Sequence, residues 1–189
     1  MIIQERKGYL LETYIALLRG INVGGKNKVS MPILKAAFEE IGFLDVVTYI
    51  NSGNIIFSSK IKDKKELIRK CEAIIIDKFM LQVPVTVVSA RELSDTLNNT
   101  PDWWDSDKEA VNYAIFVIAP TTIEEVFASV GDIKPEYEQI DSYGNVIFWT
   151  TPRESFSKAR WSKIASSSVN NHVTIRNANT VKKLLSLIK

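Results

Sequence analysis

Two stretches of the chain repeat one pattern, and this internal duplication limits the possible folds more than any other feature. Residues 50–57, INSGNIIF, resemble residues 140–148, IDSYGNVIF, and each stretch has a glycine turn between two apolar runs. The turn glycines, Gly53 and Gly144, are 91 positions apart. The order of elements traced around the first turn is β-α-β-β-α-β, the order of a ferredoxin-like plait, and the pattern restarts in the second copy. The sequence therefore predicts an α+β protein of two tandem ferredoxin-like (α-β plait) units with antiparallel sheets.

Apolar periodicity and turn residues place the elements of both copies. We expect an N-terminal extension over residues 1–12, a first unit over 13–97, a linker with Trp103 and Trp104 over 98–111, and a second unit over 112–189. The first unit is expected to hold strands at 13–19, 46–51, 54–58 and 83–89, and helices at 30–41, 63–79 and 91–97. The second is expected to hold strands at 112–118, 137–141, 145–150 and 172–176, and helices at 122–130, 155–166 and 180–188.

The hairpin strands are apolar on both faces, which an isolated plait does not explain. One face of an antiparallel sheet commonly meets water, and its strands then alternate apolar and polar residues. Here the runs 55–57 and 146–149 are apolar at every position. We therefore hypothesise that the open faces of the two sheets meet each other or a second protomer, with any ligand near that seam.

The first copy holds a glycine-rich loop that the second copy lacks. Tyr14 and Tyr113, in the leading strands, are 99 positions apart, so the first copy has 8 more residues before its hairpin turn. The loop over residues 20–30 accounts for them. Loops tolerate elaboration while the scaffold stays fixed, so we expect function to lie here.

The same loop nearly matches the Walker A pattern of P-loop nucleotide hydrolases, G-x-x-x-x-G-K-[ST]. Asn27 stands where a Ser or Thr hydroxyl would hold magnesium. The predicted helix also begins near Met31, too late for Lys26 to lie at its N-terminus. We therefore do not assign P-loop activity. Two interpretations of the loop stay open: a cradle of backbone N–H groups for an anion, with charge added by Arg19, Lys26 and Lys28, or a purely conformational role of the glycines.

Charge is unevenly distributed along the chain, although the net charge is only +2. Residues 91–141 carry a balance of −9 and residues 151–189 a balance of +7. Either these segments face each other in the fold, or the basic tail forms an anion-binding face. Within the tail, Arg176 comes after a predicted strand and before a helix, where Asn177 or Asn179 is either a helix cap or part of an anion site.

Residue types limit the chemistry. Cys71 is the only cysteine, so an intramolecular disulfide is excluded and a reducing compartment is favoured. With His172 as the only histidine, a His/Cys zinc centre is excluded, and we expect no metal and no cofactor. The N-terminus does not resemble a signal peptide, and no run approaches the ~20 apolar residues of a membrane span. We expect a cytoplasmic protein that does not contact a membrane.

Three stretches resemble the signatures of the domain of unknown function 1697 family. They are residues 14–25, YIALLRGINVGG, residues 48–54, TYINSGN, and residues 174–180, TIRNANT. The likeness covers about residues 13–189, with Asn51 where the family usually has Gln and Ala178 where it often has Trp. The resemblance implies a bacterial cytosolic protein of two ferredoxin-like units, and it brings no established activity or cofactor.

The candidate site combines the glycine loop, the first hairpin turn and the tail. Its leading interpretation is a site for a phosphorylated small molecule or a nucleotide. We expect nine residues to take part: Arg19, Asn22, Gly24, Gly25, Lys26, Ser52, Asn54, Arg176 and Asn177.

Three alternatives remain open, and whether the protein is an enzyme is not decided by the sequence. The first is a nucleic-acid-binding protein, the second a transferase or hydrolase without a metal, and the third an oligomeric scaffold without a ligand. The expected assembly is a monomer or a homodimer.

Overall fold

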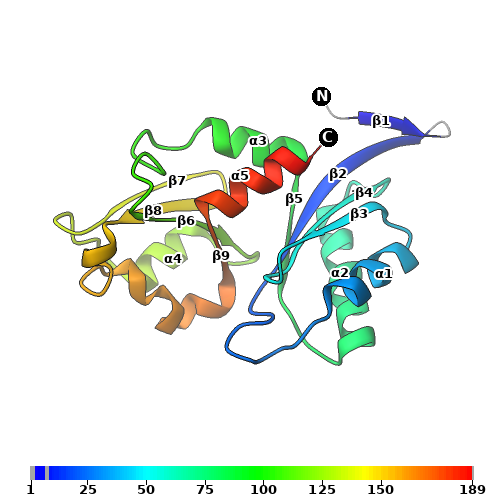
Figure 1. Ribbon diagram of the computed structural model, residues 1–189, viewed down its shortest axis with the longest axis horizontal. Helices are drawn as coiled ribbons and strands as arrows, with labels where there is room; N and C mark the ends of the chain where they lie inside the picture. Colours follow the sequence, from blue (N-terminus) through cyan, green and yellow to red (C-terminus); the bar gives the residue numbers. More distant parts are fainter. Residues whose placement is uncertain (1–2, 7–8, 189) are drawn as a thin grey trace. The chain divides into compact units, whose positions relative to one another are not determined.

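The computed structural model describes residues 3–6 and 9–188, and these form two compact units (Figure 1). The first unit comprises the described residues up to Ser94 and those from Leu184 onward. The second unit comprises Asp95–Lys183. Residues 1–2 and 7–8 of the expected N-terminal extension lie outside the described part of the chain.

The sheet of the first unit is antiparallel throughout. Its four plait strands lie in the order β3 (Leu44–Tyr49), β4 (Asn54–Ser59), β2 (Tyr9–Leu18) and β5 (Val85–Ser89). A short strand, β1 (Ile3–Arg6), pairs with the first residues of β2. At the edge, β3 is irregular, because its register with β4 shifts between Leu44 and Val47 and Asp45 takes a φ of 51°.

Two helices cover one face of this sheet, α1 (Met31–Glu40) and α2 (Lys64–Phe79), and α3 (Ala90–Asn98) follows β5. Asp63 caps α2 by accepting a hydrogen bond from the backbone N–H of Lys65. The core between helices and sheet is rich in aromatic rings, and Phe43 stacks on Phe57 with ring centroids 4.2 Å apart. Apolar burial of this kind is the main stabilising contribution to such a unit.

The second unit repeats the strand order of the first. Its antiparallel sheet runs β7 (Gln139–Tyr143), β8 (Val146–Thr151), β6 (Val111–Val117) and β9 (Val173–Asn177). One helix, α4 (Ile123–Val130), packs on the sheet, and α5 (Ala178–Leu187) follows β9. Thr122 and Glu125 cap α4 reciprocally. The prediction of two tandem ferredoxin-like units is therefore confirmed.

One predicted helix is wrong. A single helix was expected over residues 155–166, but three short 3-10 segments occupy this part of the chain, η1 (Arg153–Ser155), η2 (Trp161–Ser166) and η3 (Ser168–His172). The cause is Glu138, whose carboxylate accepts the backbone N–H groups of Arg160 (2.7 Å) and Trp161 (3.0 Å). Those donors are thereby taken out of an i→i−4 helical ladder.

The second face of each sheet is buried as well. Ile15, Leu17 and Ile56 in the first unit, and Phe116 and Phe148 in the second, have at most 5% of their surface exposed. This confirms that these faces are not hydrated. The hypothesis that they meet each other or a second protomer stays a prediction.

In the second unit, the loop before β6 provides part of this cover. Trp104 packs edge-on against Phe148 with ring centroids 5.0 Å apart, and its indole N–H donates to the carbonyl of Tyr113 at 3.0 Å. Trp104 is 5% exposed. The tryptophan thus seals the loop onto the sheet, and no stacking role is needed to explain its presence.

The carboxylate of Asp105 holds this loop against α5. It accepts hydrogen bonds from the ammonium groups of Lys108 (2.5 Å) and Lys182, and its side chain is 4% exposed. Burial acts to raise the pKa of Asp105, but the hydrogen bonds from the two lysines outweigh it, and the pKa lies below its ordinary value.

We therefore expect Asp105 to make stability depend on acid pH. A depressed pKa in the folded state contributes stability above the unfolded-state value of about 3.9, and this contribution is lost as pH falls through the lower folded value. Urea midpoints of the wild type should fall from about pH 6 to about pH 3 more steeply than those of Asp105→Asn. Equal slopes for the two proteins would show that the lysine pair does not stabilise the ionised carboxylate.

Candidate functional site

The glycine loop is a small hairpin. Val23 and Lys26 form an isolated antiparallel bridge, with the N–H of Lys26 donating to the carbonyl of Val23 at 3.0 Å. The two residues between them, Gly24 and Gly25, have φ values of 57° and 76°. A two-residue turn with positive φ at both central positions is a tight hairpin turn that favours glycine. The conformational role of these glycines is therefore sufficient to explain them.

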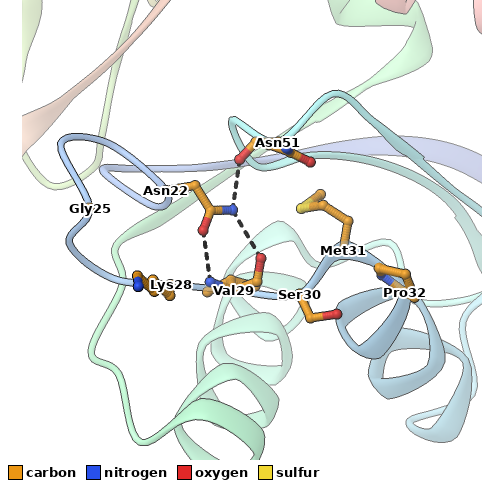
Figure 2. A pocket seen from close by; sticks show the side chains of 8 residues that line it. All are labelled: Asn22, Gly25, Lys28, Val29, Ser30, Met31, Pro32 and Asn51. Carbon is orange, nitrogen blue, oxygen red and sulfur yellow. Dashed lines mark hydrogen bonds between the residues drawn. The ribbon is translucent and has the colours of Figure 1, made fainter.

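Asn22 connects this hairpin to the rest of the first unit (Figure 2). Its amide nitrogen donates to the carbonyls of Val29 and Asn51, both at 2.9 Å, and its amide oxygen accepts from the N–H of Val29 at 2.8 Å. Asn22 itself has a φ of 55°, a conformation that asparagine tolerates better than most residues. One side chain thus fixes both ends of the loop to the turn between β3 and β4.

That turn is closely packed against the end of β2. The carbonyl of Gly53 accepts from the N–H of Leu18 at 2.8 Å, and a Cβ added at Gly53 would lie 2.6 Å from the Cβ of Leu18. Asn54 is fully buried, and its amide donates to the hydroxyl of Ser52 and to the carbonyl of Tyr49. Ser52 and Asn54 therefore serve to shape the turn.

A pocket of about 470 Å³ lies between the glycine hairpin, the β3–β4 turn and the beginning of α1 (Figure 2). Its wall combines backbone, amide and apolar groups with one ammonium group. The lining residues are Asn22, Gly25, Lys28, Val29, Ser30, Met31, Pro32 and Asn51.

The electrostatics of this pocket favour an anion. Lys28 is the only charged residue in the lining, and the first turn of α1 contains no acidic residue. Ser30 is the N-cap of α1, but its side chain makes no capping hydrogen bond. The N-terminus of a helix carries partial positive charge and backbone donors, and both attract anionic groups.

The nine residues expected at the site fall into four groups. Asn22 and Gly25 line the pocket, whereas Gly24 and Lys26 belong to the hairpin turn without lining it. In the same unit, Arg19 follows β2, Ser52 lies in the β3–β4 turn, and Asn54 is the first residue of β4. Arg19 is partly buried, and this burial lowers the pKa of its guanidinium.

The other two residues belong to the second unit. Arg176 lies on β9 with 6% of its surface exposed, and its guanidinium donates to the hydroxyl of Thr174 (2.8 Å) and the carbonyl of Ile175 (2.9 Å). Burial lowers the pKa of Arg176 to about 10. Asn177 accepts the N–H of Thr180 at 2.8 Å, so it caps α5.

Lys28 was expected only as one of the charges of the glycine loop, and five other lining residues were not expected at the site: Val29, Ser30, Met31, Pro32 and Asn51. Lys28 and Ser30 had a signal, since both precede a predicted helix start in the inserted loop. Asn51 had none, because its contribution to Asn22 is a backbone carbonyl. Within residues 3–6 and 9–188, His, Cys, Asp and Glu side chains form no cluster of three or more that could hold a metal ion.

Most of this chain matches the model of one protein family. Residues 11–148 match the family model described as "Protein of unknown function (DUF1697)". The chain belongs to the DUF1697 family. Its pocket-lining loop and its first hairpin both lie inside the matched region of DUF1697.

The chain is also similar to a protein of known structure. The conserved bacterial protein SP0830 from Streptococcus pneumoniae is 34% identical, with a TM-score of 0.85, over 95% of this chain and 99% of that chain. No curated protein matches the sequence. No helix in the described part of this DUF1697 chain has the length and apolar character needed to cross a bilayer.

Proposed function

We propose that the first unit binds a small phosphorylated molecule, such as a nucleotide, in the pocket between the glycine hairpin and the start of α1. The observation that carries the proposal is the charge of this pocket. Its single ionisable lining residue is Lys28, at a helix start that neither an acidic side chain nor a serine cap neutralises. Phosphate oxygens accept hydrogen bonds from such donors and are stabilised by the helix dipole.

The size of the pocket supports a metabolite-sized ligand. A volume of about 470 Å³ lies within the range of about 300–1,000 Å³ that is common for small-molecule sites. The apolar lining side chains Val29, Met31 and Pro32 offer a surface for the organic part of the ligand. The rigid attachment of the loop through Asn22 favours a pocket formed before the ligand arrives, which reduces the entropy lost on binding.

The test is a thermal-shift and calorimetric measurement with inorganic phosphate and adenosine monophosphate as probes. A bound ligand at about 100 times its Kd stabilises the folded state by about 2.7 kcal/mol, which is readily detected as a rise in Tm. Lys28→Gln should weaken binding about tenfold or more, because a charge-assisted hydrogen bond contributes about 1.5–3 kcal/mol.

Lys35→Gln is the matched control for this experiment. Lys35 lies on the exposed face of α1, where it pairs with Glu39 at 3.7 Å, and its replacement removes the same charge as Lys28→Gln does. We expect this variant to bind both probes as the wild type does. If neither probe raises the Tm, or if the two variants lose affinity equally, the pocket is not a phosphate site.

A further inference from the structure

The segment between β8 and β9 distinguishes the second unit from the first. In the first unit, the corresponding place between β4 and β5 holds α2, a helix of 16 residues. In the second unit it holds η1, η2 and η3, of which η2 and η3 pack beside α4. The duplicated units therefore present different surfaces at equivalent places.

From residue 155 onward, the charged residues of this segment are all of one sign. Glu154 is the last acidic residue of the chain, so residues 155–189 contain no carboxylate side chain. Lys158, Arg160 and Lys163 are exposed, and the apolar residue that directly follows each of them is buried. The buried set comprises Ala159, Trp161 and Ile164, each at most 3% exposed.

A buried carboxylate holds the backbone of these cationic residues in place through hydrogen bonds. Glu138 is 2% exposed, and its carboxylate accepts the N–H groups of Arg160 and Trp161. The ammonium of Lys134 donates to the carbonyl of Lys158 at 3.1 Å, which brings a fourth cation to the segment. We call Lys134, Lys158, Arg160 and Lys163 the basic surface of the second unit.

Within the described residues, none of the four cations of the basic surface forms an ion pair with a carboxylate. Lys158 lies over the ring of Tyr137, 5.5 Å from its centroid. On the adjacent α4, the acidic residues lie in the first turn, and the contact to η3 is a hydroxyl pair, Ser129 with Ser168 at 2.8 Å. Exposed carboxylates flank the surface in sequence at Asp132, Glu136 and Glu154.

The equivalent surface of the first unit behaves differently. On α2, Lys64 pairs with Glu92 at 2.5 Å and Lys78 pairs with Glu40 at 2.9 Å. Cations that are neutralised within the fold do not attract a polyanion, whereas exposed and unneutralised ones do. Other exposed cations of α2, such as Lys65 and Arg69, alternate with the carboxylates of Glu66, Glu72 and Asp77, whereas residues 155–172 contain no carboxylate side chain.

We propose that the basic surface binds the phosphate backbone of nucleic acid. Lysine, arginine and serine side chains are the usual donors to phosphate oxygens, and Ser157, Ser166 and Ser168 are exposed on the same segment. A row of cations on an exposed segment suits a repeating phosphate chain, whose affinity comes from the release of condensed counterions. This inference concerns the second unit and is independent of the pocket in the first.

The test is fluorescence anisotropy of the full chain with labelled single-stranded RNA and DNA of about 20 nucleotides at about 50 mM salt. The triple variant K158Q/R160Q/K163Q should lower affinity at least about tenfold and reduce the magnitude of the salt slope by about 2, since each phosphate contact contributes about 0.7 on single strands. Comparison of the RNA and DNA arms shows which nucleic acid is preferred.

The matched control is K62Q/K65Q/R69Q, which removes three exposed cations at and before α2. It should leave affinity within about twofold of the wild type, because the carboxylates of Asp63, Glu66 and Glu72 lie among these cations and lower the local positive potential. No binding at low salt, or equal losses in the two triple variants, would overturn the proposal. Displacement of the probe by polyglutamate at equal charge concentration would also overturn it, because the partner would then be any acidic polymer.

Discussion

Replacing Gly53 with alanine should destabilise the first unit by about 3 kcal/mol, whereas the same change at Gly144 should cost only about 1–2 kcal/mol. Both glycines have positive φ, 78° and 57°, so both substitutions place a Cβ in the left-handed region. Only Gly53 adds a steric overlap, since its Cβ would lie 2.6 Å from the Cβ of Leu18 and 3.0 Å from the Cδ1 of Ile21. At Gly144 a Cβ would meet nothing within 4 Å.

Urea denaturation measures this difference, and the tryptophans separate the two units. All four tryptophans lie at or after Trp103, so intrinsic fluorescence reports the second unit, while far-UV circular dichroism reports both. Gly53→Ala should lower the midpoint of the dichroism transition more than Gly144→Ala does. Equal destabilisation by the two variants would mean that Leu18 and Ile21 move aside without cost, and that the close approach of the turn to β2 is not required.

The second large effect is expected at Glu138. Its two carboxylate oxygens accept four N–H groups, from the backbone of Lys134, Arg160 and Trp161 and from the indole of Trp149. Glutamine has the same shape but offers one acceptor oxygen, so an NH₂ group must face two of these donors. Because each buried donor left unsatisfied costs about 1–3 kcal/mol, Glu138→Gln should destabilise the second unit by about 4 kcal/mol.

Tryptophan fluorescence detects this loss directly, since Trp149 and Trp161 are both partners of the carboxylate. The urea midpoint of the fluorescence transition should fall sharply in Glu138→Gln. Glu136→Gln, at an exposed position two residues away, removes the same charge and should change stability by less than about 0.5 kcal/mol. A Glu138→Gln protein as stable as Glu136→Gln would show that the four N–H groups find water as readily as the carboxylate.

The fold could be predicted from the sequence because its signals are local. Glycine turns, capping residues such as Thr122 and the alternation of apolar residues each act over a few positions, and the repeat of INSGN as IDSYGN showed that they occur twice. The segment after β8 could not be predicted in the same way. Its backbone is set by Glu138, which lies 22 residues before Arg160 in the chain, and no local pattern marks a buried carboxylate that binds backbone N–H groups.

The position of the candidate site could be predicted from the sequence, but most of the residues that line it could not. The extra residues of the first copy pointed to the loop that forms the pocket wall, and Asn22 and Gly25 do line it. The remaining lining depends on how the loop folds back, which Asn22 decides through two carbonyls and one N–H group of the backbone. Because a backbone carbonyl is the same in every residue type, contacts made through backbone atoms cannot be recognised in a sequence.

The irregular edge of the first sheet affects how copies of this chain can associate. Among the described strands, β3 pairs only with β4, and its Leu44 and Val47 are 42% and 45% exposed. If this exposed apolar edge were straight and regular, it would be a template for the addition of a strand from another molecule. The register shift and the left-handed Asp45 break the row of backbone donors and acceptors that such a strand would need. Self-association is therefore expected to use side-chain surfaces and not the extension of this sheet.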